Sequence, residues 1–128
     1  VLNPKKIVSE IHRVLKVNGQ VLVFVPFLQG FHASPHDYQR WTESGCFELF
    51  SAYSEVRVLV AEGPTSAMLW IFQEWLAQLL SFGIVPLYKL WFFLLMLITW
   101  PVKFLDVILR YHPMAKNITA GFIIEAKK

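Results

Sequence analysis

The start of the chain changes from a helical to an extended pattern of apolar positions. Residues 4–16 carry apolar side chains at helical spacing, namely Ile7, Ile11, Val14 and Leu15. This spacing predicts an amphipathic helix that buries one stripe of side chains. Asn3 can cap the helix and Pro4 suits its first position, while Asn18 and Gly19 supply a left-handed end.

A strand and a polar loop follow this helix. Residues 21–25 are apolar without alternation, which predicts a strand in the interior of a sheet that helices cover on both faces. Pro26 cannot donate to a ladder and therefore ends the strand. Residues 28–41 show no periodicity, which predicts a loop. A loop at the carboxyl end of a buried strand is where open α/β sheets bind ligands.

Three further elements are predicted on either side of a long apolar block. Residues 42–53 form a short helix that Thr42 caps. Its inward side chains are Cys46, Phe47 and Phe50. Glu55–Val60 and residues 118–126 both alternate between apolar and other positions, which predicts two half-buried strands.

The block between these two strands has a different character. Thr65 or Ser66 is expected to cap a helix that reaches Gly83, and a second segment begins at Pro86. Residues 90–98 are apolar all round. Four of the five tryptophans lie in this block, which is unusual for a helix pair that faces water.

The uncharged stretches of this block bear on how it meets a membrane. Residues 75–88 form a run of 14 and residues 90–102 a run of 13, separated by Lys89. A spanning helix needs about 20 apolar residues, and runs of roughly 10–14 are more typical of buried, re-entrant or interfacial segments. We therefore expect a helical hairpin that lies on a membrane or dips into one leaflet. The alternative is a hairpin that packs as a lid or as a dimer interface.

Charge is distributed unevenly about a net value of +3. Residues 1–74 hold six Lys and Arg against seven Asp and Glu, whereas residues 75–128 hold six against two. The positive excess is spaced among Leu, Phe and Trp, so nucleic acid is not expected as a partner. Cations that flank aromatic-rich apolar helices favour an anionic headgroup region. A membrane surface is the expected partner.

Cysteine use and the first residues bear on the compartment. Cys46 is the single cysteine, which excludes an internal disulfide and fits a reducing environment. Charged side chains among residues 5–16 interrupt any signal-peptide core. We expect a cytoplasmic protein that is peripheral or monotopic at the inner face of a membrane. The chain has no initiator methionine and opens within a helix–strand unit, so we expect it to be part of a longer protein.

Two stretches together resemble a known enzyme family. The first is Arg13-Val14-Leu15-Lys16-Val17-Asn18-Gly19-Gln20, with the apolar strand that follows it. The second begins at Phe27 and contains His32-x-x-Pro35-His36-Asp37-Tyr38-x-Arg40-Trp41-Thr42-x-x-Gly45. Both are similar to the later part of class I S-adenosylmethionine-dependent methyltransferases of the type 11 branch. In that family a helix ending in Arg-Val-Leu-Lys-Pro-Gly-Gly precedes the fifth strand of a seven-stranded Rossmann-like sheet.

The resemblance covers residues 3–62 and, as a last strand, residues 117–128. It implies an α/β fold, a partial Rossmann-like methyltransferase sheet of the last three strands, with an inserted apolar helical hairpin. On this interpretation residues 1–64 are the carboxyl-terminal part of the methyltransferase core. Residues 65–115 are the insertion and residues 116–128 are the final core strand.

The implied cofactor is S-adenosyl-L-methionine, whose binding motifs would lie upstream of Val1. The family's glycine-rich loop follows the first strand, and its ribose-binding acidic residue follows the second. No cofactor-binding residue is therefore assigned in this chain. The missing amino-terminal half of the same domain is an expected partner, and the chain alone would be inactive.

The polar loop supplies the candidate site residues. Methyl transfer to a hydroxyl requires a positioned acceptor and a base that removes its proton. His32, His36 and Asp37 are the catalytic candidates, because they follow the strand and histidine titrates near neutrality. The substrate-binding candidates are Phe27, Tyr38, Arg40 and Trp41. The alternative is that His36 or Asp37 only caps the loop and that Arg40 pairs with Asp37 to hold it.

Other uses of these residues are less favoured. A metal site at His32 and His36 would need further ligands, and Pro35 disfavours the helix that would align the two imidazoles. No metal is predicted. A hydrolase would need a Ser or Cys nucleophile motif, which the sequence lacks. The predicted function is methyl transfer to a small or lipid-linked acceptor, and the alternative is a non-catalytic membrane-associated interaction module on an α/β scaffold.

Overall fold

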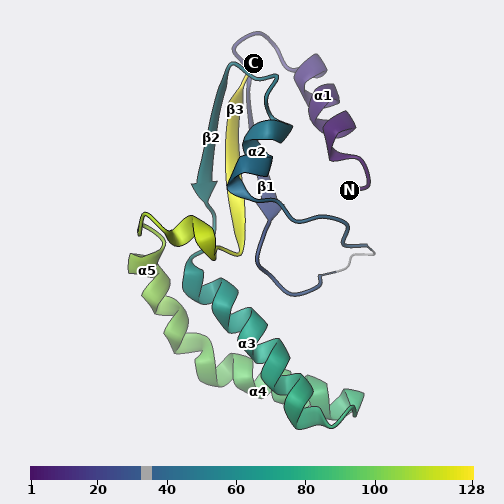
Figure 1. Cartoon of the computed structure of the whole chain (residues 1–128), viewed down its shortest axis with the longest axis vertical. Helices are drawn as coiled ribbons and strands as arrows, with labels where there is room; N and C mark the ends of the chain where they lie inside the picture. The colour runs from purple at the N-terminus through teal and green to yellow at the C-terminus, as the bar shows by residue number, and fades with distance from the viewer. Residues whose placement is uncertain (33–35) are drawn as a thin grey trace. The chain divides into compact units, whose positions relative to one another are not determined.

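The computed structural model describes residues 1–32 and 36–128, which form two compact units. The first unit comprises Val1–Ala61 together with Gly121–Lys128, and the second comprises Glu62–Ala120. The predicted insertion, residues 65–115, falls within the second unit. Figure 1 follows the chain through both.

The first unit is an α/β structure with three strands and two helices. In chain order they are α1 (Pro4–Val14), β1 (Gln20–Pro26), α2 (Glu43–Leu49), β2 (Glu55–Val60) and β3 (Gly121–Lys127). The predicted strands are confirmed, with the bounds of β2 as expected. The last strand begins at Gly121 rather than at Ile118, because residues 115–117 form a 3-10 turn before it.

The sheet has the order β1-β3-β2, so the last strand lies between the two earlier ones (Figure 1). Both pairings are antiparallel, and Ile124 is opposite Val23 on one side and Val58 on the other. It follows that β1 and β2 run in the same direction without pairing with each other. The N–H of Ala61 donates to the carbonyl of Gly121 at 3.0 Å, which extends the pairing just beyond β2.

The hydrophobic core of the first unit lies on one face of this sheet. Cys46, Phe50 and Tyr53 come from the α2 region and contact the inward side chains of the strands, Val25, Phe122, Ile124 and Ala126. From α1, Val8 joins the same core, and the Tyr53 hydroxyl donates to the Val8 carbonyl at 3.3 Å. Cys46 is fully buried, as the sequence predicts, and burial raises the pKa of its thiol to about 11.

The opposite face of the sheet is open among the described residues. Leu22 and Phe24 of β1 are 68% and 53% exposed. The prediction of a strand in the interior of a sheet, covered by helices on both faces, is therefore wrong for the described residues, in which β1 is an edge strand that pairs with β3 alone. The physical reason is that α1 and α2 supply a single layer, so only the alternate residues that face them are covered.

Two smaller predictions about inward faces are wrong in part. On α1, Leu15 packs against the core as predicted, but the buried side chain is Val8 and both Ile7 and Val14 are exposed, because the face toward the sheet contains Val8 and Leu15. The helix ends at Val14, before the left-handed Asn18. On α2, Phe47 is exposed while Cys46, Leu49 and Phe50 are buried, because spacings of three and four residues place these three on the face toward the sheet and Phe47 beside it.

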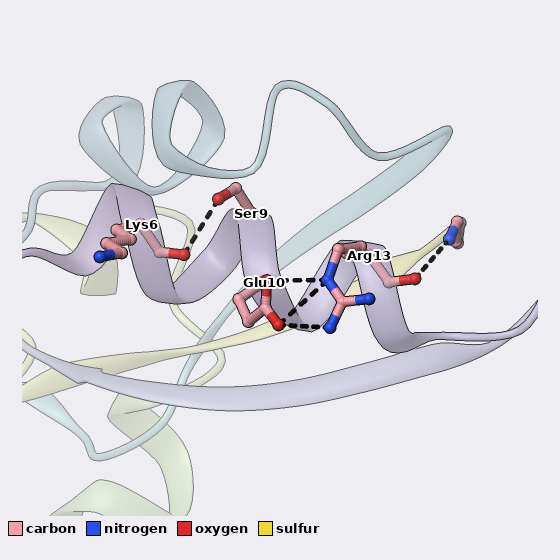
Figure 2. Close-up of polar contacts among 5 residues, drawn as sticks. Lys6, Ser9, Glu10 and Arg13 are labelled. Carbon is pink, nitrogen blue, oxygen red and sulfur yellow. Dashed lines mark hydrogen bonds and ion pairs between the residues drawn. The ribbon is translucent and has the colours of Figure 1, made fainter.

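Several polar side chains of α1 form local contacts, as Figure 2 shows. The guanidinium of Arg13 bonds to the carboxylate of Glu10 at 2.6–3.0 Å, and the Ser9 hydroxyl donates to the Lys6 carbonyl at 3.0 Å. Near the end of the helix, Lys128 Nζ donates to the carbonyl of Arg13 at 3.4 Å. A cation at a helix carboxyl end is favourable, because the last carbonyls carry partial negative charge.

The second unit is a helical hairpin followed by short turns. Its elements are α3 (Pro64–Ser81), α4 (Val85–Thr99), a 3-10 segment η1 (Trp100–Leu105), α5 (Asp106–Leu109) and η2 (Ala115–Asn117). Figure 1 shows α3 and α4 side by side. The hairpin turns at Phe82 and Gly83, which both have positive φ values, of 50° and 80°.

Helical structure continues from α4 through η1 and α5. The segment Val85–Leu109 has 25 residues, and its most apolar stretch of 18 residues has a mean hydropathy of 2.0, so by length and composition it could cross a membrane. This helical segment is longer than either uncharged run of the sequence, because it continues through Lys89 and Lys103. Only 6% of this most apolar stretch is buried, whereas the core helix of a water-soluble protein is mostly buried.

Candidate functional site

The polar loop that follows β1 is anchored at both ends. The N–H of Trp41, at the end of the loop, donates to the carbonyl of Pro26, at its start, at 2.9 Å. This bond closes the loop against the end of β1. Immediately afterwards, the hydroxyl of Thr42 accepts from the N–H of Gly45 at 3.2 Å and caps α2, as predicted. Residues 33–35, which include Pro35 of the quoted pattern, lie outside the described residues.

Asp37 and Arg40 form the most strongly bonded pair in this loop. The two guanidinium Nη groups of Arg40 donate to the two carboxylate oxygens of Asp37. Arg40 also donates to the carbonyl of Gly30 at 3.1 Å, and the N–H of His32 donates to Asp37 at 3.0 Å. The side chain of Asp37 is 10% exposed. This network ties together three points of the loop that are distant in sequence.

The electrostatics of the pair bear on the role of Asp37. The Arg40 guanidinium and the His32 N–H lower the pKa of Asp37 to about 2. A carboxylate with so low a pKa is a weak base near neutral pH. The geometry therefore favours the alternative role for this residue, in which Arg40 pairs with Asp37 to hold the loop.

A small pocket lies between the loop, α1 and the end of β1. Its volume is about 220 Å³, and its walls are mostly apolar side chains such as Ile7, Ile11 and Val23. Four of the predicted site residues also line it, namely His36, Asp37, Tyr38 and Trp41. The rings of His36 and Tyr38 are 5.4 Å apart between centroids. The structure thus brings a histidine and two aromatic side chains to one apolar pocket.

The other predicted residues lie elsewhere. Phe27 packs against the hydrophobic core, with its ring 5.7 Å from that of Phe122. His32 is exposed and takes part in the loop network through its backbone, and Arg40 lies in that network and does not line the pocket. Within residues 1–32 and 36–128, no three His, Cys, Asp or Glu side chains gather as metal ligands would.

A second depression lies on the open face of the sheet. It has a volume of about 420 Å³ and is lined by charged side chains of β2 and β3, including Arg57, Glu125 and Lys127. Arg57 is opposite Glu125 in the register, and Lys127 Nζ is 3.5 Å from a carboxylate oxygen of Glu55. These residues alternate with the core positions of their strands. In the sequence, that alternation is the signal from which their position on one face of the sheet could be predicted.

Comparisons with protein-family models, curated proteins and solved structures found no match to this chain. An activity must therefore be inferred from the chain itself. Three features are available for this purpose: the loop after β1, the apolar pocket beside it, and the order and direction of the strands.

Proposed function

We propose that this chain is the carboxyl-terminal, substrate-side part of a class I S-adenosylmethionine-dependent methyltransferase. The observation that carries this proposal is the strand order. In the seven-stranded sheet of that family, the last strand is antiparallel to the others and lies between the fifth and the sixth. The antiparallel β3 lies between β1 and β2, which are parallel to each other, and the quoted sequence pattern aligns β1 with the fifth strand.

The open parts of the first unit are consistent with a missing partner half. Within the described residues β1 pairs with β3 alone, so its other edge carries unpaired backbone groups. Leu22 and Phe24 form part of an exposed apolar face on the same strand. In the proposal, the upstream half of the domain pairs with this edge and supplies the cofactor-binding residues.

The pocket is too small to hold the cofactor itself. Its volume of about 220 Å³ is below the roughly 300–1,000 Å³ of typical ligand sites. The cofactor, when bound to the complete domain, supplies an electrophilic methyl group. The residues of this chain would act on the acceptor: Tyr38 and Trp41 contact it, and His36 accepts a proton from its hydroxyl group. Asp37 and Arg40 hold the loop in place.

The acceptor is proposed to be a lipid or a lipid-linked molecule at the cytoplasmic face of a membrane. Support comes from the second unit, because Val85–Leu109 is apolar, long and largely exposed. An enzyme that is held at a membrane meets substrates that reside there. In this arrangement the hairpin lies on the membrane or enters one leaflet, and the first unit faces the cytoplasm.

The proposal is tested with the full-length protein, including the region encoded upstream of Val1. We expect that region to contain a strand followed by a glycine-rich turn, and the full-length protein to transfer a labelled methyl group from S-adenosylmethionine to extracted lipids. The His36→Ala variant should lose about 10²-fold in rate. The His112→Ala variant replaces an exposed histidine of the second unit and should retain full activity.

A different outcome would favour the second candidate function. If the upstream region lacks the glycine-rich turn and the full-length protein does not bind S-adenosylmethionine, the enzyme proposal is wrong. The paired Asp37 and Arg40 and the open sheet face would then fit a non-catalytic, membrane-associated interaction module. Equal activity of His36→Ala and wild type would remove only the assigned role of His36.

A further inference from the structure

The outer surface of the hairpin is apolar on both of its helices. On α3 the exposed side chains include Met68, Ile71, Phe72, Trp75 and Leu79. From α4 to α5 they include Phe93, Leu97, Ile98, Trp100, Phe104 and Ile108. The turn between the helices adds Phe82, which is 85% exposed. No polar face is available on either helix to cover so much apolar surface in water.

Polar side chains lie instead between the helices, where they bond to one another. Gln73, which is 8% exposed, donates from Nε2 to the Thr99 hydroxyl at 2.5 Å. Closer to the turn, the Tyr88 hydroxyl donates to the carboxylate of Glu74. Gln73 and Glu74 of α3 thus have polar partners on α4, whereas Gln78 of the same helix is exposed.

The open end of the hairpin is joined by a third set of polar contacts. Asp106 accepts from the backbone N–H groups of Thr65 and Ser66, both at 2.8 Å, and from the Ser66 hydroxyl at 2.7 Å. This carboxylate caps the amino end of α3 from outside that helix, since Gly63 offers no side chain for the purpose. The three sets of contacts are distributed along the length of the hairpin.

The packing between the helices depends on small residues. Ala67, Ala77 and Ser81 of α3 are buried, with Ala77 fully so. From α4 to α5, the side chains that meet α3 recur at a spacing of seven, four and seven residues, at Tyr88, Leu95, Thr99 and Asp106. Small residues and hydrogen bonds between helices are the means by which helices associate in lipid, where apolar burial gives no driving force.

Charged side chains are few in the hairpin. Residues 66–102 contain only Glu74 and Lys89 as charged side chains; Glu74 is bonded to Tyr88, whereas Lys89 is exposed. Lys103 and Arg110 follow near the open end, remote from the turn at Phe82. Cations at one end of an apolar segment suit the headgroup region of a bilayer.

We infer that the α3–α4 hairpin is embedded in the hydrocarbon of a lipid bilayer, with acyl chains against the outer faces of both helices and the polar contacts enclosed between them. A hairpin lying flat on a membrane would bury one apolar side and leave the other in water. The two apolar outer faces require lipid on both sides. This inference deepens the proposed membrane association and does not depend on methyl transfer.

Single introduced cysteines test the inference in the 128-residue chain. Trp75→Cys, Ile98→Cys and Phe82→Cys mark the two outer faces and the turn, and Val17→Cys marks an exposed site of the first unit. Native Cys46 does not react near neutral pH, because it is buried and its thiol pKa is raised to about 11. Each variant carries an environment-sensitive fluorophore and is mixed with vesicles of phosphatidylcholine and phosphatidylglycerol.

We expect the labels at positions 75, 82 and 98 to shift to the blue, and brominated acyl chains to quench them several-fold. The label at position 17 should be quenched by aqueous iodide instead. If only one of positions 75 and 98 enters the lipid, the hairpin lies on the surface and the inference is wrong. It is also wrong if both labels stay accessible to iodide, or if they become protected without vesicles because two chains associate. Methyl transfer is not measured, so the two proposals can fail separately.

Discussion

In the first unit, the fully buried side chains include Phe50, Phe122 and Ile124, while the ion pair between Glu10 and Arg13 lies at the surface. The second unit encloses polar side chains as well as apolar ones. Gln73 is buried between the helices, Leu69 and Leu95 are also buried, and Ile98 on the outer surface is 70% exposed. The two units thus differ in how polar and apolar side chains are divided between interior and surface.

This difference indicates that the two units are suited to different surroundings. In water, burial of apolar area stabilises a fold, at about 25 cal/mol per Å². In hydrocarbon that term vanishes, and unsatisfied polar groups become the main cost. The first unit has the buried apolar core that stabilises a fold in water. The hairpin has the enclosed polar contacts that a fold in hydrocarbon needs. The same kind of substitution should therefore change stability by different amounts in the two units.

The largest expected effect comes from a matched pair of Phe→Ala substitutions. Phe50 is fully buried in the first unit, so Phe50→Ala should lower the free energy of unfolding by about 3–5 kcal/mol. Phe93 lies on the outer face of α4, and Phe93→Ala should change the stability in detergent micelles far less. Denaturant unfolding in micelles measures both. Equal losses would remove the contrast between the units.

The second prediction concerns the contact that closes the open end of the hairpin. Asp106→Ala removes three accepted hydrogen bonds from the start of α3, and should lower its stability by about 1–2 kcal/mol. Asp106→Asn keeps an acceptor oxygen and should lose less. Thermal unfolding followed by circular dichroism in micelles distinguishes the two variants. An unchanged midpoint for Asp106→Ala would mean that this contact does not hold the hairpin.

The third prediction uses pH to examine the loop of the first unit. Because the pKa of Asp37 is lowered to about 2, its pairing with Arg40 should be fully present above the ordinary carboxyl pKa of about 4. The stabilisation should decline as the pH falls from there through about 2. Carbon NMR of the Asp37 carboxylate measures its titration directly. In Arg40→Gln the midpoint should rise toward the ordinary value, and no rise would mean that the ion pair does not cause the shift.

The smallest effect is expected at Lys89, which is a charged residue within the apolar segment. Replacing it with leucine removes a charge that is unfavourable in hydrocarbon, so Lys89→Leu should bind neutral vesicles more tightly, by a factor of a few. Val17→Leu on the first unit serves as the control for added apolar surface. Vesicle flotation measures the bound fraction. Weaker binding of Lys89→Leu would place this residue at the headgroups.

Much of the first unit could be predicted from local patterns. The bounds of β2 follow from strict alternation between turn residues, and the start of α2 follows from the Thr42 cap. The covering of β1 could not be predicted, because an apolar run does not reveal whether one or two helical layers are present. Similarly, the sequence does not show that α1 buries Val8 and exposes Ile7, since both side chains are apolar.

The candidate site could be predicted only in part. The loop and its residue types are evident in the sequence, and the pairing of Arg40 with Asp37 was one of two alternatives that the residues allow. The pocket beside His36 depends on α1 and β1 coming together, which no local pattern specifies. For the same reason the bond between Gln73 and Thr99 was not predicted, because it joins residues on two different helices.

The hydrogen bond between Ala61 and Gly121 has a practical consequence for protein engineering. It joins the two points at which the chain leaves the sheet and returns to it, so residues 62–120 form an excursion whose ends are adjacent. A short glycine-containing linker could connect β2 directly to β3 as an ordinary β-hairpin. Such a shortened protein would lack the whole apolar hairpin while keeping the pairing of β2 with β3, so the two units could be studied separately.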